Sequence, residues 1–408
     1  MTSIRLSHLV LPMVVVAASG ADWPGIFGPN RDGVSPEKGL LASWPKKGPP
    51  VVWEREAGEG YSGPVVAGDA VVLFHRVGGE EIVACLHAAT GKDRWKFSYP
   101  TAYSDLLGKG DGPRATPLIA DGKVWTLGAA GVFSCINLSD GSKLWQRDLL
   151  ADYAPRPSFF GVGSTPLLEN GRLLVNVGAA GAGVVCFDAA TGKEMWKATN
   201  QGASYSSPVA ATIDGVRHAI FFTREGVLSL DPATGAERFS KRWRSRMDAS
   251  VNAATPQVVG DLLFVTASYN TGALLVRCKK DGLEQLWTSD RVLSSQYATP
   301  IVHDGYLYGC DGRSDAGAVA LRCLELKTGN VLWSKESFGS SAVTYADGHL
   351  ILLTEDGDLV LCDCTPAGYR ELARSAVLTA PVRALPALSG GRFYARDNRR
   401  LMCWDLRK

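Results

Sequence analysis

An eleven-residue motif recurs along the chain at a nearly constant spacing. Its clearest copies read CLHAATGKDRW at residues 85–95, CINLSDGSKLW at 135–145 and CFDAATGKEMW at 186–196. Two further copies are SLDPATGAERF at 229–239 and CLELKTGNVLW at 323–333. Repetition with a period of about 40 to 50 residues is typical of proteins built as an array of one supersecondary unit. The repeat therefore constrains the fold more than any single residue does.

A second motif gives the number of repeats. Each copy consists of a small residue, a proline, a short apolar run and a glycine-containing turn. These anchors lie at Pro64, Pro117, Pro166, Pro208, Pro256 and Pro300, with weaker copies around Ala342 and Pro386. By subtraction, neighbouring anchors are 42 to 53 residues apart, which matches one four-stranded propeller blade. The sequence therefore predicts eight blades.

Residues 116–149 show the plan of one blade. The apolar segments TPLIA, KVWTLG, VFSCINL and SKLWQRDL are separated by the turns DG, AAG and SDG. Their apolar residues are mostly β-branched or aromatic, and no segment carries a long helical period. We therefore predict an all-β, eight-bladed β-propeller made of four-stranded antiparallel blades.

The tryptophan that ends the motif is assigned a structural role. The motif glycine forms the hairpin between the third and fourth strands, where it accepts a positive φ. The tryptophan follows on the outermost strand, and we expect it to be buried against the neighbouring blade, because a side chain of that size is repeated around the ring. The tryptophans assigned to this docking position are Trp53, Trp95, Trp145, Trp196, Trp287 and Trp333.

Most of the cysteines share one position of the repeat, on the third strand. They are Cys85, Cys135, Cys186, Cys323, Cys362 and Cys403. Equivalent positions in different blades are held apart by the ring, so these residues are expected to be buried free thiols. The remaining Cys278, Cys310 and Cys364 allow at most one disulfide, and no set has the spacing of a zinc site. No metal is predicted.

The two ends of the chain complement each other. The last copy, RLMCWDLRK, stops at Lys408 before its turn and fourth strand. The missing strand is found near the N-terminus, where Val51 to Glu56 includes the tryptophan at position 53. We predict that this segment pairs with the C-terminal strand, which closes the ring and removes exposed sheet edges.

Residues 1–21 have the pattern of a secretory signal peptide, with a basic residue at Arg5 and an apolar stretch that is too short to span a membrane. Cleavage is expected after Ala21, and no cysteine follows that could carry a lipid anchor. The domain prediction is a signal peptide at 1–21, a leader segment at 22–47 and the propeller at 48–408. A periplasmic or secreted protein that does not span the membrane is expected.

The charge of the chain excludes one class of partner. The formal net charge is +2, which is too small to indicate nucleic-acid binding.

The segment DAATGKEMW at residues 188–196 is similar to the tryptophan-docking motif of the pyrroloquinoline quinone (PQQ) repeat family. That family includes the propellers of quinoprotein dehydrogenases and the propeller subunit of the outer-membrane β-barrel assembly machinery. The opening DWPGIFGPNRDG at residues 22–33 resembles the leader of exported, non-enzymatic bacterial members. The resemblance covers nearly the whole mature chain. It implies the fold, and it leaves the activity open because the repeat is a packing device.

The resemblance also implies what an enzyme of this family needs. Its quinoproteins hold PQQ against a disulfide between adjacent cysteines, with a calcium or lanthanide ion on Glu, Asn and Asp ligands. Here no two cysteines are adjacent, the nearest pair is Cys362 and Cys364, and no CxxCH haem motif occurs. We therefore predict no catalytic residue and no cofactor, and keep PQQ with Ca²⁺ only as an alternative.

The propeller register predicts a ring of residues at the mouth of the central channel. The innermost strand of each blade begins there, so the residue three before each anchor should face the channel. These residues are Tyr61, Arg114, Gly163, Tyr205, Ala253, Tyr297, Gly339 and Arg383. The tyrosines and arginines are a candidate site for a planar or anionic ligand. In the alternative interpretation they only cap the channel, with the tyrosines bonded to backbone and the arginines to solvent.

Three long connections between blades are candidate partner loops, because aromatic and arginine side chains are common anchors of protein interfaces. Their candidate residues are Tyr103, Phe159, Phe160, Arg242, Trp243 and Arg244. The alternative is that these loops are only solvated.

Three functions are compatible with the sequence. The leading hypothesis is an exported scaffold without catalysis, expected to be a monomer, that binds a protein or small ligand through its loop face. The second is a quinoprotein-like, PQQ-binding oxidoreductase or redox partner. The third is a component of envelope biogenesis. A protein partner in the periplasm or cell envelope is expected.

Overall fold

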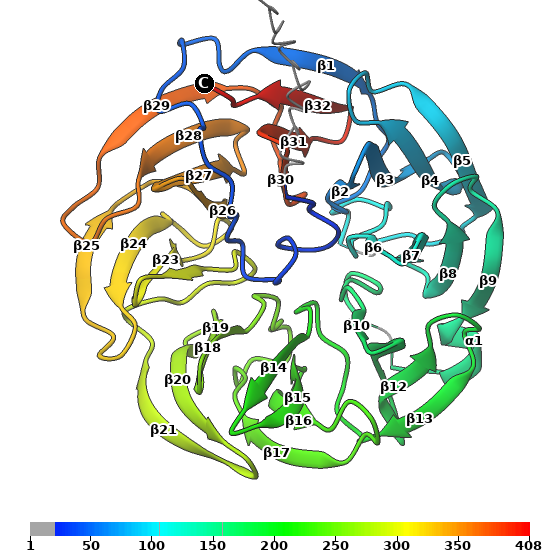
Figure 1. Cartoon of the computed structure of the whole chain (residues 1–408). Coiled ribbons are helices and arrows are strands. Elements are labelled where there is room, and N and C mark those ends of the chain that lie inside the picture. Colours follow the sequence, from blue (N-terminus) through cyan, green and yellow to red (C-terminus); the bar gives the residue numbers. More distant parts are fainter. Residues whose placement is uncertain (1–20, 106, 157) are drawn as a thin grey trace, which may run out of the picture.

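The computed structural model describes residues 21–105, 107–156 and 158–408. Eight four-stranded sheets stand in a ring around a central channel (Figure 1), so the predicted fold class is confirmed. Within each sheet neighbouring strands are antiparallel. In seven of the sheets the strands follow the order of the sequence from the channel to the rim. The predicted signal peptide lies outside the described residues, except for Ala21.

Seven blades are built from consecutive strands. Blade 1 consists of β2 (Val65–Ala67), β3 (Ala70–Val77), β4 (Glu80–His87) and β5 (Asp93–Pro100). Blade 2 consists of β6 (Leu118–Ala120), β7 (Lys123–Leu127), β8 (Val132–Asn137) and β9 (Lys143–Asp148), and blade 3 of β10 (Leu167–Glu169), β11 (Arg172–Ala179), β12 (Ala182–Asp188) and β13 (Glu194–Ala198). Blade 4 consists of β14 (Val209–Ile213), β15 (Val216–Phe222), β16 (Gly226–Leu230) and β17 (Glu237–Arg242). Blade 5 consists of β18 (Gln257–Val259), β19 (Leu262–Ala267), β20 (Gly272–Lys279) and β21 (Gly282–Ser289). Blade 6 consists of β22 (Ile301–His303), β23 (Tyr306–Asp311), β24 (Ala320–Glu325) and β25 (Val331–Lys335). Blade 7 consists of β26 (Ser341–Ala346), β27 (His349–Thr354), β28 (Asp358–Asp363) and β29 (Glu371–Ala376).

Blade 8 joins the two ends of the chain. Its inner strands are β30 (Ala387–Ser389), β31 (Arg392–Arg396) and β32 (Arg400–Asp405), and its outer strand is β1 (Val51–Glu56). β1 runs antiparallel to β32, with Trp53 opposite Cys403. The predicted closure by Val51–Glu56 is therefore confirmed.

A docking tryptophan of one blade lies on the turn glycine of the next blade. The indole of Trp145 lies on Gly192, which has a φ of 70°, and a Cβ added to this glycine would approach the ring to 2.7 Å. The indole N–H of Trp145 also donates to the carbonyl of Ala189, at 3.1 Å. Equivalent indole–glycine contacts join Trp53 to Gly91, Trp95 to Gly141, Trp196 to Gly235 and Trp287 to Gly329. The glycine thus serves two purposes, since it accepts the positive φ and leaves room for the ring.

The expected burial of these indoles is only partly right. Trp53 is 8 % exposed, whereas the other five docking tryptophans are half-buried. In these five, one ring face meets the next blade and the rest of the side chain lies at the rim. Trp53 is also on an outer strand, but it is packed within the core cluster that includes Trp23 and Leu40 of the leader. The N–H of Trp196 has no hydrogen-bond partner among the described residues.

The small residue before the anchor proline links the blades near the channel. The backbone N–H of Thr116 donates to the hydroxyl of Thr165 at 3.0 Å, and the N–H of Thr165 donates to the hydroxyl of Ser207 at 3.0 Å. The same bond joins Thr255 to Thr299, at 2.9 Å. The threonine or serine of this motif is therefore a hydrogen-bonding link between blades, which the sequence pattern alone did not reveal.

The nine cysteines are all free. The six in the repeated position have no exposed surface, as predicted, and five of them lie opposite the docking tryptophan of their own blade on the neighbouring strand. Burial raises the pKa of Cys186 to about 12, so this thiol stays protonated at neutral pH.

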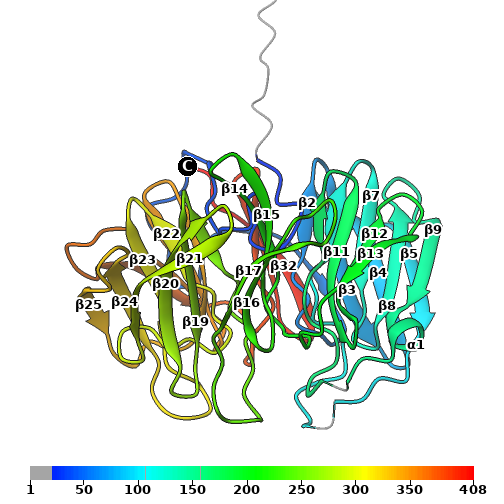
Figure 2. The same ribbon diagram turned by 90° about the horizontal axis from the view of Figure 1, so that it is seen from below.

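The two faces of the ring differ (Figure 2). One face carries the leader, residues 22–47, and the turns that hold the docking glycines. The other carries the connections from the outer strand of one blade to the inner strand of the next, and we call it the loop face. One of these connections contains the short helix α1 (Leu149–Tyr153), whose first N–H groups are capped by Asp148.

Substitution of the docking glycine tests the indole contact. We expect Gly192→Ala to lower the free energy of unfolding by about 2 to 5 kcal/mol, because it adds both backbone strain and a clash with Trp145. Gly171→Ala is the matched control, since Gly171 has a φ of 74° but open space around an added Cβ. It should lose only about 1 to 2 kcal/mol. Equal losses in urea unfolding would contradict the proposed packing.

Candidate functional site

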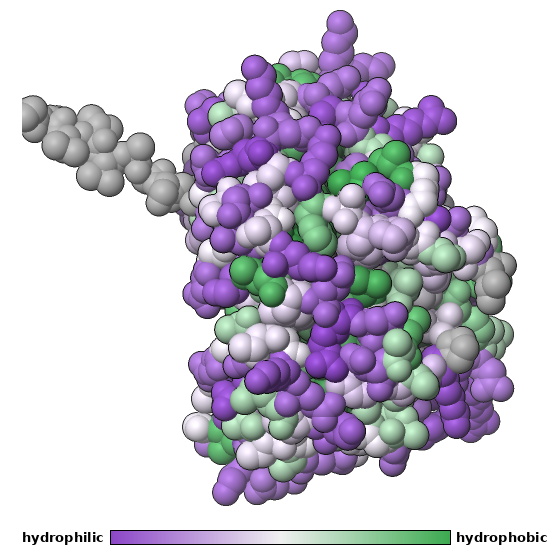
Figure 3. All heavy atoms as spheres, turned by 90° about the vertical axis from the view of Figure 1, so that its right-hand side faces the viewer, coloured by the Kyte–Doolittle hydropathy of each residue, from purple (hydrophilic) through white to green (hydrophobic). Residues whose placement is uncertain are grey.

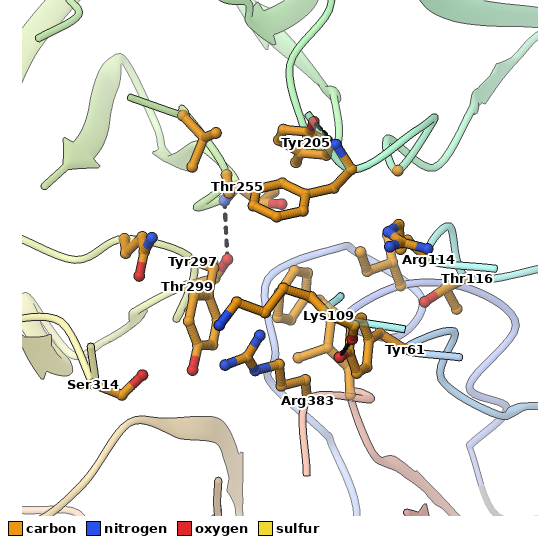
Figure 4. Close-up of a pocket in the computed structure, with 18 of the residues that line it drawn as sticks. Tyr61, Lys109, Arg114, Thr116, Tyr205, Thr255, Tyr297, Thr299, Ser314 and Arg383 are labelled. Carbon is orange, nitrogen blue, oxygen red and sulfur yellow. Dashed lines mark hydrogen bonds between the residues drawn. The ribbon is translucent and has the colours of Figure 1, made fainter. Parts of the chain in front are cut away.

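The predicted channel ring lines a recess on the loop face. Its volume is about 250 Å³. Of the eight predicted positions, the recess is lined by Tyr61, Arg114, Gly163, Tyr205, Ala253, Tyr297 and Arg383. Gly339 is the one ring position that is not among the lining residues. The inner-strand register thus brings residues from seven blades to one place (Figure 4).

The leader forms the inner end of this recess, which sequence reasoning missed. Figure 1 shows the leader crossing the central channel, and its residues Ile26 and Phe27 line the recess. The leader is fixed by β-bridges from Trp23 to Val66 and from Val34 to Tyr345. The apolar residues of the leader lie among prolines and glycines and do not alternate as in a strand. The sequence therefore provides little indication that the leader lines the recess.

Arg31 fixes the leader inside the channel. Its guanidinium is buried and donates to the carbonyls of Pro208, at 2.7 Å, and Pro166. These prolines are the anchors of blades 4 and 3. Burial lowers the pKa of Arg31 to about 10, so the side chain remains charged at neutral pH.

The two arginines of the ring are paired with carboxylates. Arg114 lies 3.0 Å from the carboxylate of Asp105, and both side chains are nearly inaccessible, at 8 % and 0 %. Arg383 lies 2.6 Å from Glu355. Loop carboxylates that the sequence pattern did not reveal therefore already compensate the charge of both arginines. In the capping alternative the arginines bond to solvent, whereas here they bond to these carboxylates. Ligand binding at the ring stays a prediction.

The three tyrosines present their rings to the recess while their hydroxyls bond to the protein. The hydroxyl of Tyr61 donates to the carbonyl of Lys109, and that of Tyr297 donates to Glu355 at 2.7 Å. The hydroxyl of Tyr205 accepts the N–H of Phe160, at 2.7 Å. The ring of Tyr61 lies between two guanidiniums, 5.8 Å from that of Arg114 and 5.7 Å from that of Arg383. These contacts hold the aromatic walls in place.

The first two candidate partner loops border the recess. Phe160 lines it and packs edge-on against Tyr205, with ring centroids 5.6 Å apart. Tyr103 packs under Arg114, at 5.1 Å. Phe159 is 37 % exposed and lines a second cavity of about 350 Å³, together with Tyr103 and Leu150.

The third candidate loop is less accessible than predicted. Trp243 is half-buried against the core of blades 4 and 5, and its N–H donates to the carbonyl of Gly272 at 3.3 Å. The side chain of Arg244 is only 13 % exposed, so Arg242 alone remains exposed among the three. The indole at 243 follows the outer strand directly and therefore packs between blades instead of projecting as an interface anchor.

The residues present do not fit the quinone and metal pair of the family's enzymes. Cys362 is buried in β28, and neither Cys362 nor Cys364 lines the recess. The nearby carboxylates of Asp105 and Glu355 are bound by arginines. Within residues 21–105, 107–156 and 158–408, no group of three His, Cys, Asp or Glu residues is arranged to hold a metal ion.

The sequence matches a known family over more than half of its length. Residues 78–335 match the family model described as outer membrane protein assembly factor BamB. The chain belongs to this family. Among its relatives, the assembly factor BamB of Escherichia coli K12 is 25 % identical over 327 residues, which are 76 % of this chain and 79 % of the relative. The BamB of Moranella endobia is 24 % identical over 310 residues, or 70 % and 76 % of the two chains.

Solved structures agree with the fold. The crystal structure of BamB from Moraxella catarrhalis superimposes with a TM-score of 0.64 and 15 % identity, over 87 % of this chain and 99 % of that one. A quinohemoprotein alcohol dehydrogenase from Comamonas testosteroni gives 0.63 and 13 %, over 94 % and 80 %. At such identities the likeness shows the propeller fold alone. In the described part of the chain, no helix is long and apolar enough to cross a bilayer.

Breaking the ion pair of Arg383 tests the electrostatics of the recess. We expect Glu355→Gln to lower the free energy of unfolding by about 1 to 3 kcal/mol at pH 7, because it leaves Arg383 unpaired and partly buried. The double variant Glu355→Gln with Arg383→Gln should recover part of this loss in urea unfolding. A double variant that is less stable than Glu355→Gln would contradict the pairing.

The same carboxylate predicts a pH dependence. Burial alone would raise the pKa of Glu355, but the hydrogen bond from Tyr297 and the charge of Arg383 bring it below its ordinary value. A lowered folded pKa stabilises the fold above the unfolded pKa of about 4.3. This stabilisation is lost as the pH falls through the folded pKa. Glu355→Gln should therefore show a smaller loss of stability between pH 6 and pH 3 than the wild type, and an unchanged profile would contradict the lowered pKa.

Proposed function

We propose that the chain is an exported, non-catalytic propeller scaffold that takes part in outer-membrane protein assembly and binds a protein partner through its loop face. Membership of the assembly-factor family supports a role in outer-membrane protein assembly. The predicted signal peptide supports export. The lack of fit between the recess and the quinone and metal pair supports a role without catalysis.

The observation that carries the protein-binding part is the exposed apolar surface at the second cavity. Leu150 is 41 % exposed and Phe159 is 37 % exposed, and both line the same cavity on the loop face. The outer rim in Figure 3 is mostly hydrophilic, with separate hydrophobic spots. Exposed apolar side chains around a concavity are typical of a binding surface, whereas scattered ones are ordinary.

The oxidoreductase alternative has no specific support. Its strongest argument is the fold likeness to a quinohemoprotein dehydrogenase, at 13 % identity. A fold is shared by proteins of many functions, so this likeness does not carry an activity.

Site-specific photo-cross-linking in the native envelope tests the scaffold role. We expect a photoreactive phenylalanine analogue in place of Leu150 to form an adduct with a component of outer-membrane protein assembly, identified by mass spectrometry. Leu144 is the matched control, because it is 45 % exposed on the nearby outer strand β9 but lies at the rim. It should give no such adduct.

Two results would contradict the proposal. One is the absence of an assembly component among the adducts at position 150. The other is an equal yield of the same adduct from positions 144 and 150, which would show random collision.

A further inference from the structure

We propose that the recess at the channel mouth, defined by Tyr61, Arg114, Tyr205, Tyr297 and Arg383, binds a small planar aromatic monocarboxylate. This inference goes beyond the scaffold role and requires no protein partner. It rests on the charges around the recess, on its aromatic walls and on its shape.

The charges of the recess leave one cation in excess. Arg114 is paired with Asp105, Arg383 with Glu355, and the lining Asp315 with Arg313. The remaining charged side chain of the lining is Lys109, which makes no salt bridge within 4.0 Å in the described residues, although its charge helps to lower the pKa of Asp315. One unpaired cation favours a ligand with a single negative charge.

Lys109 is placed to meet a ligand in the recess. Its carbonyl accepts the hydroxyl of Tyr61, and its N–H donates to Asp105 at 3.0 Å, so its backbone is fixed on both sides. Figure 4 shows its side chain extending across the recess from the Tyr61 side toward Tyr297 and Arg383. The ammonium can therefore approach a carboxylate held between these walls.

The walls favour an aromatic ligand over an aliphatic one. Tyr61, Tyr205, Tyr297, Phe27 and Phe160 all line the recess. A flat ring can meet them in offset-stacked or edge-on contacts, which stabilise aromatic pairs beyond the burial of area alone. The hydroxyls of the tyrosines are already bonded, so these rings offer faces and edges instead of free polar groups.

The shape of the recess limits the size of the ligand. The leader fills the channel behind it, and the volume is about 250 Å³. Since an apolar cavity of roughly 150 Å³ accommodates benzene, there is room here for two fused rings and a carboxylate. Larger ligands would have to displace Phe27 and the leader held by Arg31.

Calorimetric titration of the mature protein with 2-naphthoate tests the inference. We expect a dissociation constant on the order of 0.1 mM, in keeping with the affinity of small ligands in preformed pockets. The neutral isostere 2-naphthamide should bind about tenfold more weakly, because it lacks the charge. Cyclohexanecarboxylate should bind more weakly still.

Two variants locate the site. Lys109→Met should remove the preference for 2-naphthoate over 2-naphthamide and leave the binding of 2-naphthamide unchanged. Lys193→Met is the matched control, an exposed lysine in a turn on the opposite face, and should bind both ligands as the wild type does. Ala253→Leu should weaken both ligands, because the larger side chain fills the recess.

The inference is overturned if 2-naphthoate does not bind the wild type at millimolar concentration. It is also overturned if Lys109→Met and Ala253→Leu bind both ligands as the wild type does, which would place them elsewhere. Equal affinity of the two ligands for the wild type would refute the charge recognition. None of these results depends on the cross-linking experiment, so the two proposals can fail separately.

Discussion

The contact of one indole with one turn glycine, repeated between neighbouring blades, positions the rest of the molecule. Because glycine has no Cβ, the ring reaches the backbone of the next blade, as Trp145 does on Gly192. Hydroxyl bonds such as that between Thr116 and Thr165 join the same blades near the channel. With inner and outer edges both linked, each inner strand starts at a fixed point. The recess is therefore a product of blade packing.

The indole–glycine contacts could be predicted from the sequence, because the tryptophan and the glycine recur in it with a fixed period. The threonine or serine before the anchor proline recurs as well, but its hydrogen bond to the next blade could not be read from the period. The closing strand was found since Trp53 completes a pattern that the C-terminal copy lacks, and its pairing with β32 follows from the same register. The channel ring was found in the same way, by counting three residues back from each anchor. Period and register thus predicted the number of blades and seven of the residues that line the recess.

Contacts that occur once could not be predicted, because they leave no period. Asp105 lies in a long connection and Glu355 in a turn, and neither has a counterpart in other blades, so their pairing with Arg114 and Arg383 was missed. Trp243 lies outside the repeat, so the sequence favours a surface anchor, whereas the indole packs on blades 4 and 5. The position of the leader in the channel could not be predicted for the same reason, although Arg31 donates to the carbonyls of two anchor prolines.

The recess and the second cavity both open on the loop face, and they share part of their lining. Since the leader fills the channel from behind, a ligand reaches the recess from the side on which Phe159 and Leu150 are exposed. Gly163 lines both cavities, and Phe160 of the first adjoins Phe159 of the second. A ligand in one cavity and a partner at the other therefore contact the same short segment. If the conformation of this segment differs between the free and bound states, linkage requires the ligand to change the affinity for the partner, and the partner to change the affinity for the ligand, by the same factor.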